Sequence, residues 1–177
     1  MAVNICYVPI GVIRSPFKEV SGMPIQPSGA RGTQGEVVLL EEHVPGLKDL
    51  EGFSHLILLY HFHLSKEPSL LVKPFLDEVP RGVFATRAPA RPNPIGLSVV
   101  KLKGIQENRV LVEDIDVVDG TPLLDIKPYV PRFDCRVDAI IGWLAERVEA
   151  SEECRSDDRF SSHSGRPTGA GLQQRTK

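Results

Sequence analysis

Residues 53–64 read FSHLILLYHFHL and form the most apolar segment of the chain. Side chains of a strand alternate between its two faces, so Leu56, Leu58 and Tyr60 share one face while Ile57 and Leu59 share the other. Both faces are mostly apolar, which is typical of a strand buried on both sides. We therefore predict a central buried strand here and interpret the flanking sequence around it.

Segments on either side show the same β-rich character. Asp119-Gly120 is a hairpin signal that would join the last two of them. A chain with many strands must protect its sheet edges, and closure of the sheet achieves this. The sequence predicts a mainly β fold, a single-sheet antiparallel β-barrel. Further strands are expected at 5–13, 36–40, 82–86, 95–103, 109–118 and 122–127.

A C-terminal helix is predicted after the last strand. Its apolar residues recur at helical spacing between Val137 and Val148, and Asp134 is its expected N-cap. Beyond residue 150 the chain is polar, rich in Ser, Gly and Arg, and without periodicity. We expect one domain over residues 1–150 and a disordered tail over 151–177.

The overall composition excludes several classes of protein. The 177 residues carry a net charge of −2, so a polyanion partner would need a local basic patch. No apolar run reaches the ~20 residues of a membrane helix, and the N-terminus does not resemble a signal peptide. Three widely spaced cysteines suit a reducing compartment. We expect a cytoplasmic protein with no membrane partner.

The most unusual segment is the loop 87–96, which reads RAPARPNPIG. Its three prolines hold the backbone extended, so the loop loses little entropy when it surrounds a ligand. Arg87 and Arg91 offer guanidinium groups, which suit carboxylates and phosphates. The alternative is a rigid barrel corner whose arginines cap carbonyl groups.

Acidic residues gather near two strand ends. Asp114 and Asp116 share a face, and an acid in a pocket can accept hydrogen bonds from ribose hydroxyls, an ammonium group or a nucleophile. A solvated strand face is the alternative. Asp125, Lys127 and Tyr129 lie within five residues, where the first two could simply neutralise each other.

Histidines and glycines do not indicate a metal or a dinucleotide. His61 and His63 are about 7 Å apart along a strand, but no third or fourth ligand is evident, so we expect no metal. Glycines 29, 32 and 35 precede a strand rather than a helix, which argues against a Rossmann fold.

Several long motifs resemble the TrmO family. They occur in the family's order from about residue 7 to 133: IGVIRSPF at 10–17, QP at 26–27, FSHL at 53–56, GVFATR at 82–87, RPNPIG at 91–96, DGTP at 119–122 and DIKPY at 125–129. The resemblance implies an S-adenosylmethionine-dependent methyltransferase that acts on N6 of threonylcarbamoyl-adenosine at position 37 of tRNA. It also implies a β-barrel homodimer with the cofactor near the subunit interface.

The resemblance also implies the site residues. Expected to bind the cofactor are Pro27, Ser28, Gly29, Leu64, Ser65, Arg87, Leu97, Glu113, Asp114, Ile115 and Asp116. Asp125 is the candidate weak base, with Arg91 and Tyr129 nearby. The partners are tRNA, through its anticodon loop, a small-molecule methyl donor and a second copy of the chain.

A local cationic cluster is predicted to bind the RNA, made of Arg81, Arg87, Arg91, Lys101 and Lys103. A non-catalytic β-barrel that binds a nucleoside-like ligand or RNA is the main alternative. A metal hydrolase would need His61 and His63 in an ion site.

Overall fold

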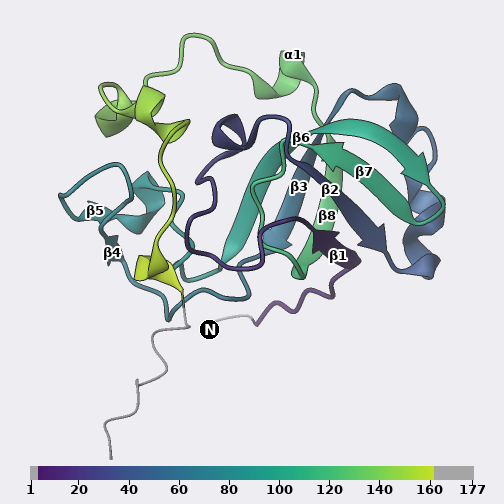
Figure 1. Ribbon diagram of the computed structural model, residues 1–177, viewed down its shortest axis with the longest axis horizontal. Coiled ribbons are helices and arrows are strands. Elements are labelled where there is room, and N and C mark those ends of the chain that lie inside the picture. The colour runs from purple at the N-terminus through teal and green to yellow at the C-terminus, as the bar shows by residue number, and fades with distance from the viewer. Residues whose placement is uncertain (1–3, 162–177) are drawn as a thin grey trace, which may run out of the picture.

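The computed structural model describes residues 4–161, within which six antiparallel strands close into a barrel (Figure 1). Their order around the barrel is β1-β2-β7-β6-β3-β8. The strands are β1 (Gly11–Arg14), β2 (Gln34–Leu39), β3 (His55–His61), β6 (Ile95–Gln106), β7 (Arg109–Glu113) and β8 (Thr121–Pro128). The predicted single-sheet antiparallel barrel is confirmed.

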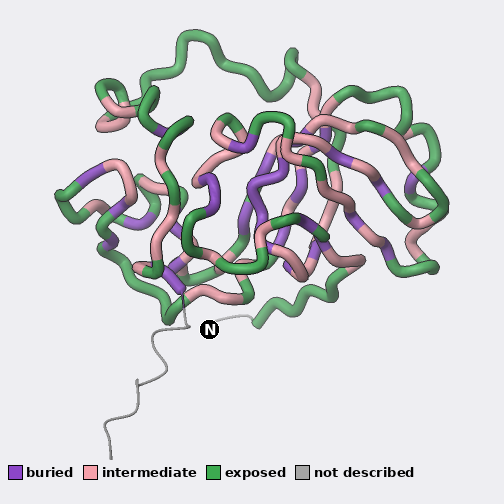
Figure 2. Tube along the Cα trace, in the orientation of Figure 1, coloured by how far each residue is buried: buried purple, intermediate pink, exposed green. Residues whose placement is uncertain are grey.

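The core fills the interior of the barrel. Leu56, Leu58 and Tyr60 of β3 are buried in it, together with residues such as Val100 and Leu123 from neighbouring strands. Figure 2 shows buried positions along the barrel strands. The opposite face of β3 is only half-buried. The prediction that this strand is buried on both sides was wrong, because a closed single sheet has an interior and an exterior.

Short helices and a small hairpin connect the barrel strands. The hairpin pairs β4 (Leu71–Val72) with β5 (Arg81–Gly82). The predicted strand at 82–86 was wrong, because most of it forms the 3-10 helix η4 (Val83–Ala85). The other 3-10 helices of this part are η1 (Pro27–Ala30), η2 (Glu41–Leu47) and η3 (Leu50–Gly52).

The turn at Asp119-Gly120 does not join two paired strands. β7 ends at Glu113, and β8 pairs with β1 and β3 instead. The Asp119 carboxylate accepts a hydrogen bond from the backbone N–H of Ser15 (3.1 Å) and pairs with Lys18 (2.9 Å). These contacts attach the turn to the segment after β1, so residues 114–118 cross the end of the barrel.

The predicted C-terminal helix over 137–148 is absent from the described residues. A short α-helix, α1 (Pro131–Asp134), ends before this region, and its Asp134 carboxylate accepts a hydrogen bond from Val130 N–H (2.7 Å). Val137 and Ile140 are 96% and 97% exposed, so within residues 4–161 nothing covers the first part of the expected apolar stripe. Gly142 has a φ of 56°, which interrupts α-helical geometry at the start of η5 (Gly142–Leu144); η6 (Val148–Ser151) follows.

Residues 151–161 are ordered, contrary to the predicted tail. They include η7 (Asp158–Phe160) and pack beside the β4-β5 hairpin (Figure 1). Phe160 and Ser161 are buried, because Phe160 packs edge-on against Phe75. The rest of the predicted tail lies outside the described residues. None of the helices within residues 4–161 has the length and hydropathy to cross a membrane.

Candidate functional site

A cavity of about 660 Å³ lies where the loops beyond the barrel end meet the C-terminal segment. Its walls are mostly apolar and include Met23, Phe62, Phe75, Val117, Trp143 and Phe160. Polar groups come from separate segments and include Gln26, Ser28, His63, Arg87 and Asp116. This size and lining are typical of small-molecule sites, which commonly occupy ~300–1,000 Å³.

Asp116 is the buried acid of the cavity. The Ser98 hydroxyl donates a hydrogen bond to its Oδ1 (2.5 Å), and the Tyr60 hydroxyl lies 3.0 Å from the Ser98 oxygen. Burial, followed by the nearby Asp116 charge, raises the pKa of Tyr60, so its hydroxyl stays protonated and can donate to Ser98. Burial raises the pKa of Asp116 to about 6, although the Ser98 bond and Arg87 act in the opposite direction.

Gly96 makes room for this hydrogen-bonded chain. A Cβ atom built on Gly96 would lie 2.2 Å from the ring of Tyr60. Because Tyr60 is buried within the core, its ring has little space to move away. The glycine of the Pro-Ile-Gly motif therefore permits the ring position from which Tyr60 reaches Ser98.

Arg87 supplies the positive charge of the cavity. Its Nη1 donates to the side-chain oxygen of Gln26 (2.9 Å), which links the 87–96 loop to the loop before β2. The charge of Arg87 also lowers the pKa of both Tyr60 and Asp116, after larger contributions from other groups. The cavity thus presents an anion and a cation among apolar walls.

His63 is the other titratable group on the cavity lining. Burial and the neighbouring His61 lower its pKa, so the ring is predominantly neutral at neutral pH. Its Nδ1 lies 3.4 Å from the Thr121 hydroxyl. Within residues 4–161 no three His, Cys, Asp or Glu side chains gather as a metal site would require.

The fold and these segments agree with a known family. A model of the tRNA-methyltransferase O (TrmO) N-terminal domain matches residues 12–135. The chain belongs to the TrmO family. Its barrel and its long motifs are therefore those of a TrmO domain.

Curated relatives and solved structures support the same assignment. A probable S-adenosyl-L-methionine-binding protein of Pyrococcus abyssi is 56% identical over 158 residues, covering 89% of this chain and 86% of that protein. The tRNA (adenine(37)-N6)-methyltransferase of Escherichia coli is 39% identical, covering 81% of this chain and 65% of its own length. A crystal structure of TrmO from Pseudomonas aeruginosa superposes with a TM-score of 0.68 at 43% identity, covering 81% of this chain and 62% of that chain.

The TrmO motifs are only partly brought together around the cavity. Of the residues expected to bind the cofactor, those on the cavity wall are Ser28, Leu64, Ser65, Arg87 and Asp116. Those outside its lining are Pro27, Gly29, Leu97, Glu113, Asp114 and Ile115. The cavity therefore draws on four of the expected segments, with one or two residues from each.

The residues outside the lining have other partners. Lys101 pairs with both Glu113 (3.2 Å) and Asp114 (3.1 Å). Burial raises the pKa of Asp114, but the Gly32 N–H (2.8 Å) and Lys101 outweigh it and hold this pKa below its usual value. Ile115 is fully buried, and Leu97 is 45% exposed on the barrel exterior.

The candidate catalytic residues also lie outside the cavity lining. Asp125 pairs with Lys127 (2.5 Å) on β8, and Tyr129 packs edge-on against His55 with ring centroids 6.3 Å apart. The Arg91 guanidinium donates to the carbonyl oxygens of Thr86 (3.0 Å) and Ala88 (3.2 Å). These contacts agree with the alternative interpretation, in which Asp125 and Lys127 neutralise each other and Arg91 caps carbonyl groups.

Most side chains of the predicted cationic cluster already pair with acidic side chains of the same chain. Arg81 pairs with Asp77 (2.6 Å), and Lys103 pairs with Glu113 (3.4 Å) beside Lys101. Arg81, Lys101 and Lys103 are therefore partly neutralised before any RNA binds, whereas Arg91 keeps its charge while its guanidinium binds carbonyl oxygens.

Several residues of the cavity, and of the hydrogen-bonded chain that supports Asp116, were missed by sequence reasoning. Tyr60 and Ser98 were placed only as strand residues, and Trp143 and Phe160 as a helix residue and a tail residue. The alternation within β3 and β6 carried a signal, because it places the polar Tyr60 hydroxyl and Ser98 inside the barrel, where each must find a partner.

Proposed function

We propose that this protein is an S-adenosylmethionine-dependent methyltransferase that methylates N6 of threonylcarbamoyl-adenosine at position 37 of tRNA. Membership of the TrmO family and the name of the Escherichia coli relative support the reaction class. The observation that carries the proposal is the cavity, where Arg87 and Asp116 stand among apolar walls on segments that the family motifs single out.

The chemistry of the cavity fits the cofactor. S-adenosylmethionine has an amino-acid end with a carboxylate and an ammonium group, a ribose and a flat adenine. Arg87 suits the carboxylate, and ionised Asp116 suits the ammonium group or a ribose hydroxyl. Aromatic walls such as Phe62 and Trp143 suit the adenine.

When bound, the cofactor supplies an electrophilic methyl group on a sulfonium centre. The role of the protein is to hold this group in line with the accepting nitrogen and to keep water out, because alignment governs direct displacement. The stiff 87–96 loop helps to hold the methyl group in line, and the apolar walls keep water out. The N–H of the ureido-like acceptor is more acidic than that of a plain adenine amine, so a weak base suffices.

We further propose that a homodimer completes the site. Asp125, Arg91 and Tyr129 do not reach the cavity lining of their own protomer, so they would act there only from a second copy. Exposed apolar side chains offer a surface for this copy, including Leu97, Phe133, Val137 and Ile140. Free, exposed Cys6 and Cys135 suit a reducing, cytoplasmic location.

The reaction is tested by incubating the full chain with methyl-labelled S-adenosylmethionine and anticodon-loop-containing tRNA that carries or lacks the threonylcarbamoyl group. Label in a nucleoside heavier by one methyl group is expected only with the modified tRNA. Cofactor binding without transfer to either tRNA would contradict the proposal and favour a non-catalytic barrel.

The shared site is tested by complementation. Arg87→Ala and Asp125→Ala are each expected to be inactive, whereas their co-expressed mixture regains roughly a quarter of wild-type activity, because one site of each mixed dimer is intact. Arg87→Ala mixed with Asp116→Asn is the matched control, since both changes lie in one cavity and every site keeps a defect. Equal rescue in both mixtures would contradict a site shared in this way.

A further inference from the structure

The C-terminal segment 151–161, here called the strap, is an integral wall of the cavity. It lies beyond the residues 12–135 that the family model matches, yet Ser151, Ser156 and Phe160 line the cavity. It follows the loop that carries Trp143, another lining residue. The site therefore depends on chain that the TrmO motifs do not include.

One end of the strap is attached to the loop before η1. Ser156 N–H donates to the Met23 carbonyl (2.9 Å), and Gly22 N–H donates to the Ser156 carbonyl (2.8 Å). The Ser156 hydroxyl accepts from Met23 N–H (3.2 Å) and donates to the carbonyl of Val20. Arg155 forms a β-bridge with Pro24. Both the backbone and the side chain of Ser156 thus hold this loop.

Gly29 shows how closely the strap approaches the predicted cofactor loop 27–29. A Cβ atom on Gly29 would lie 2.8 Å from the Glu152 carbonyl oxygen and 3.3 Å from that of Ser151. Arg31 also pairs with Glu152 (2.9 Å). Gly29 therefore serves the packing of the strap, which explains why it belongs to the loop without lining the cavity.

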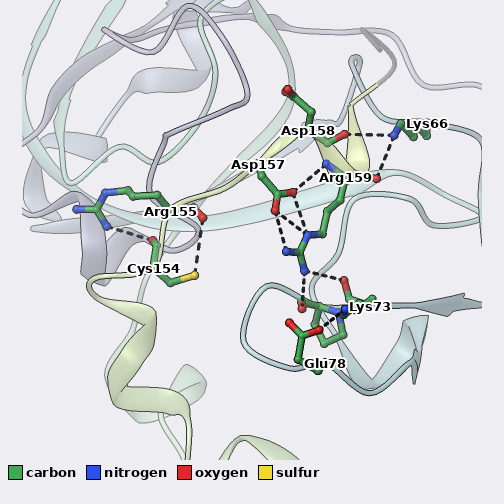
Figure 3. Close-up of polar contacts among 9 residues, drawn as sticks. Lys66, Lys73, Glu78, Cys154, Arg155, Asp157, Asp158 and Arg159 are labelled. Carbon is green, nitrogen blue, oxygen red and sulfur yellow. Dashed lines mark hydrogen bonds and ion pairs between the residues drawn. The ribbon is translucent and has the colours of Figure 1, made fainter. Parts of the chain in front are cut away.

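The other end of the strap is attached to the predicted cofactor segment 64–65 and its neighbours. Ser161 forms a β-bridge with Ser65, and Lys66 N–H donates to the Phe160 carbonyl (3.0 Å). Figure 3 shows the Lys66 ammonium group between the carbonyl oxygens of Asp158 (3.2 Å) and Arg159 (3.3 Å).

Arg159 ties the same end to the β4-β5 hairpin. Its guanidinium forks onto Asp157 (2.7 Å), as Figure 3 shows. It also donates to the Pro74 carbonyl (3.0 Å). It also lies over the ring of Phe75, 5.0 Å from the centroid. Phe75 and Phe160 both line the cavity, so these contacts fix two of its apolar walls.

We propose that the strap is the clasp of the cofactor site, with Ser156 and Phe160 as positioning residues that hold segments 27–29 and 64–65 on either side of the methyl donor. The inference rests on the proposed function. Because the closed strap forms the binding-competent cavity, ligand binding and strap closure favour each other. A variant that loosens the strap lowers affinity by the fraction of molecules that are open.

The first test measures S-adenosylmethionine affinity of full-length variants by calorimetry. Ser156→Ala removes neutral hydrogen bonds and is expected to weaken binding roughly 3- to 10-fold. Phe160→Ala is expected to weaken it further. The matched controls are Ser54→Ala and Phe53→Ala, which lie outside the cavity on exposed positions and are expected to bind as the wild type does.

The second test uses the unaltered protein, so it does not depend on how a variant folds. Hydrogen exchange is followed with and without S-adenosylmethionine. Slower exchange is expected at the amides that bridge strap and loops, those of Met23, Lys66 and Ser156.

The possible outcomes distinguish failure of the proposed function from failure of the clasp. Wild-type protein that binds no S-adenosylmethionine overturns the proposed function and the clasp together. Binding that is unaffected by Ser156→Ala and Phe160→Ala, or that leaves the exchange of these amides unchanged, overturns the clasp alone.

Discussion

Replacing Asp116 by Asn should make the protein more stable at neutral pH while impairing its ligand site. The side chain is buried, and its pKa is raised by burial from 3.8 to about 6. A raised pKa means that the folded protein favours the protonated acid. The contribution of Asp116 to stability is thus fully present below about pH 4 and is lost as the pH rises through about 6.

The size of the effect follows from the two pKa values. The interval between 3.8 and about 6 corresponds to about 3 kcal/mol, which ionised Asp116 removes from the free energy of unfolding. Asn has nearly the same shape, carries no charge, and keeps an oxygen that can accept the Ser98 hydrogen bond. The variant should therefore gain up to ~3 kcal/mol at pH 8, or roughly 6–12 °C in melting temperature.

The assay is urea unfolding of wild type and Asp116→Asn at pH 4, 5, 6, 7 and 8. The gain should grow with pH between 4 and 7 and then level off. Asp125→Asn is the matched control, because this acid is half-exposed and paired with Lys127, so its replacement should change stability by less than ~1 kcal/mol. An Asp116→Asn gain of the same size at pH 4 and pH 8, or a loss at pH 8, would refute the reasoning.

Three other predictions concern the same site and the RNA. Gly96→Ala should destabilise the protein by about 1–3 kcal/mol, because its Cβ would overlap the Tyr60 ring; an unchanged urea midpoint would contradict this. Ser98→Ala removes a hydrogen bond that lowers the pKa of Asp116, so the pH midpoint for S-adenosylmethionine binding should rise by roughly one to two pH units, as calorimetry between pH 5 and 9 would show. Modified tRNA should bind more weakly as salt rises from ~50 to ~200 mM in filter-binding assays; a flat response would exclude a mainly electrostatic contact.

The barrel was predictable because its determinants are local. The β-rich segments 95–103 and 109–118 and the apolar run of β3 indicate strands without knowledge of their partners. The helix over 137–148 failed for the opposite reason: a helical stripe forms a helix only when a surface covers it, and Val137 and Ile140 stay exposed in the protomer.

In the candidate site, too, residues within local motifs were predictable and residues that depend on distant contacts were not. Family motifs led to Arg87 and Asp116, which do lie on the cavity. The chain from Tyr60 through Ser98 to Asp116 joins three separate parts of the sequence, so no local pattern announces it. The strap was missed because its polar sequence has no periodicity; its order comes from backbone contacts such as that between Met23 and Ser156.

The central claim is that the cavity beside Asp116 and Arg87 is where the methyl donor sits. A crystal structure of the full chain with S-adenosylhomocysteine, the demethylated product, tests it most directly. We predict that the ligand occupies this cavity with its amino-acid end at Arg87 and with Phe160 of the strap against it. A ligand bound elsewhere on the barrel, with the cavity left to solvent, would contradict the account.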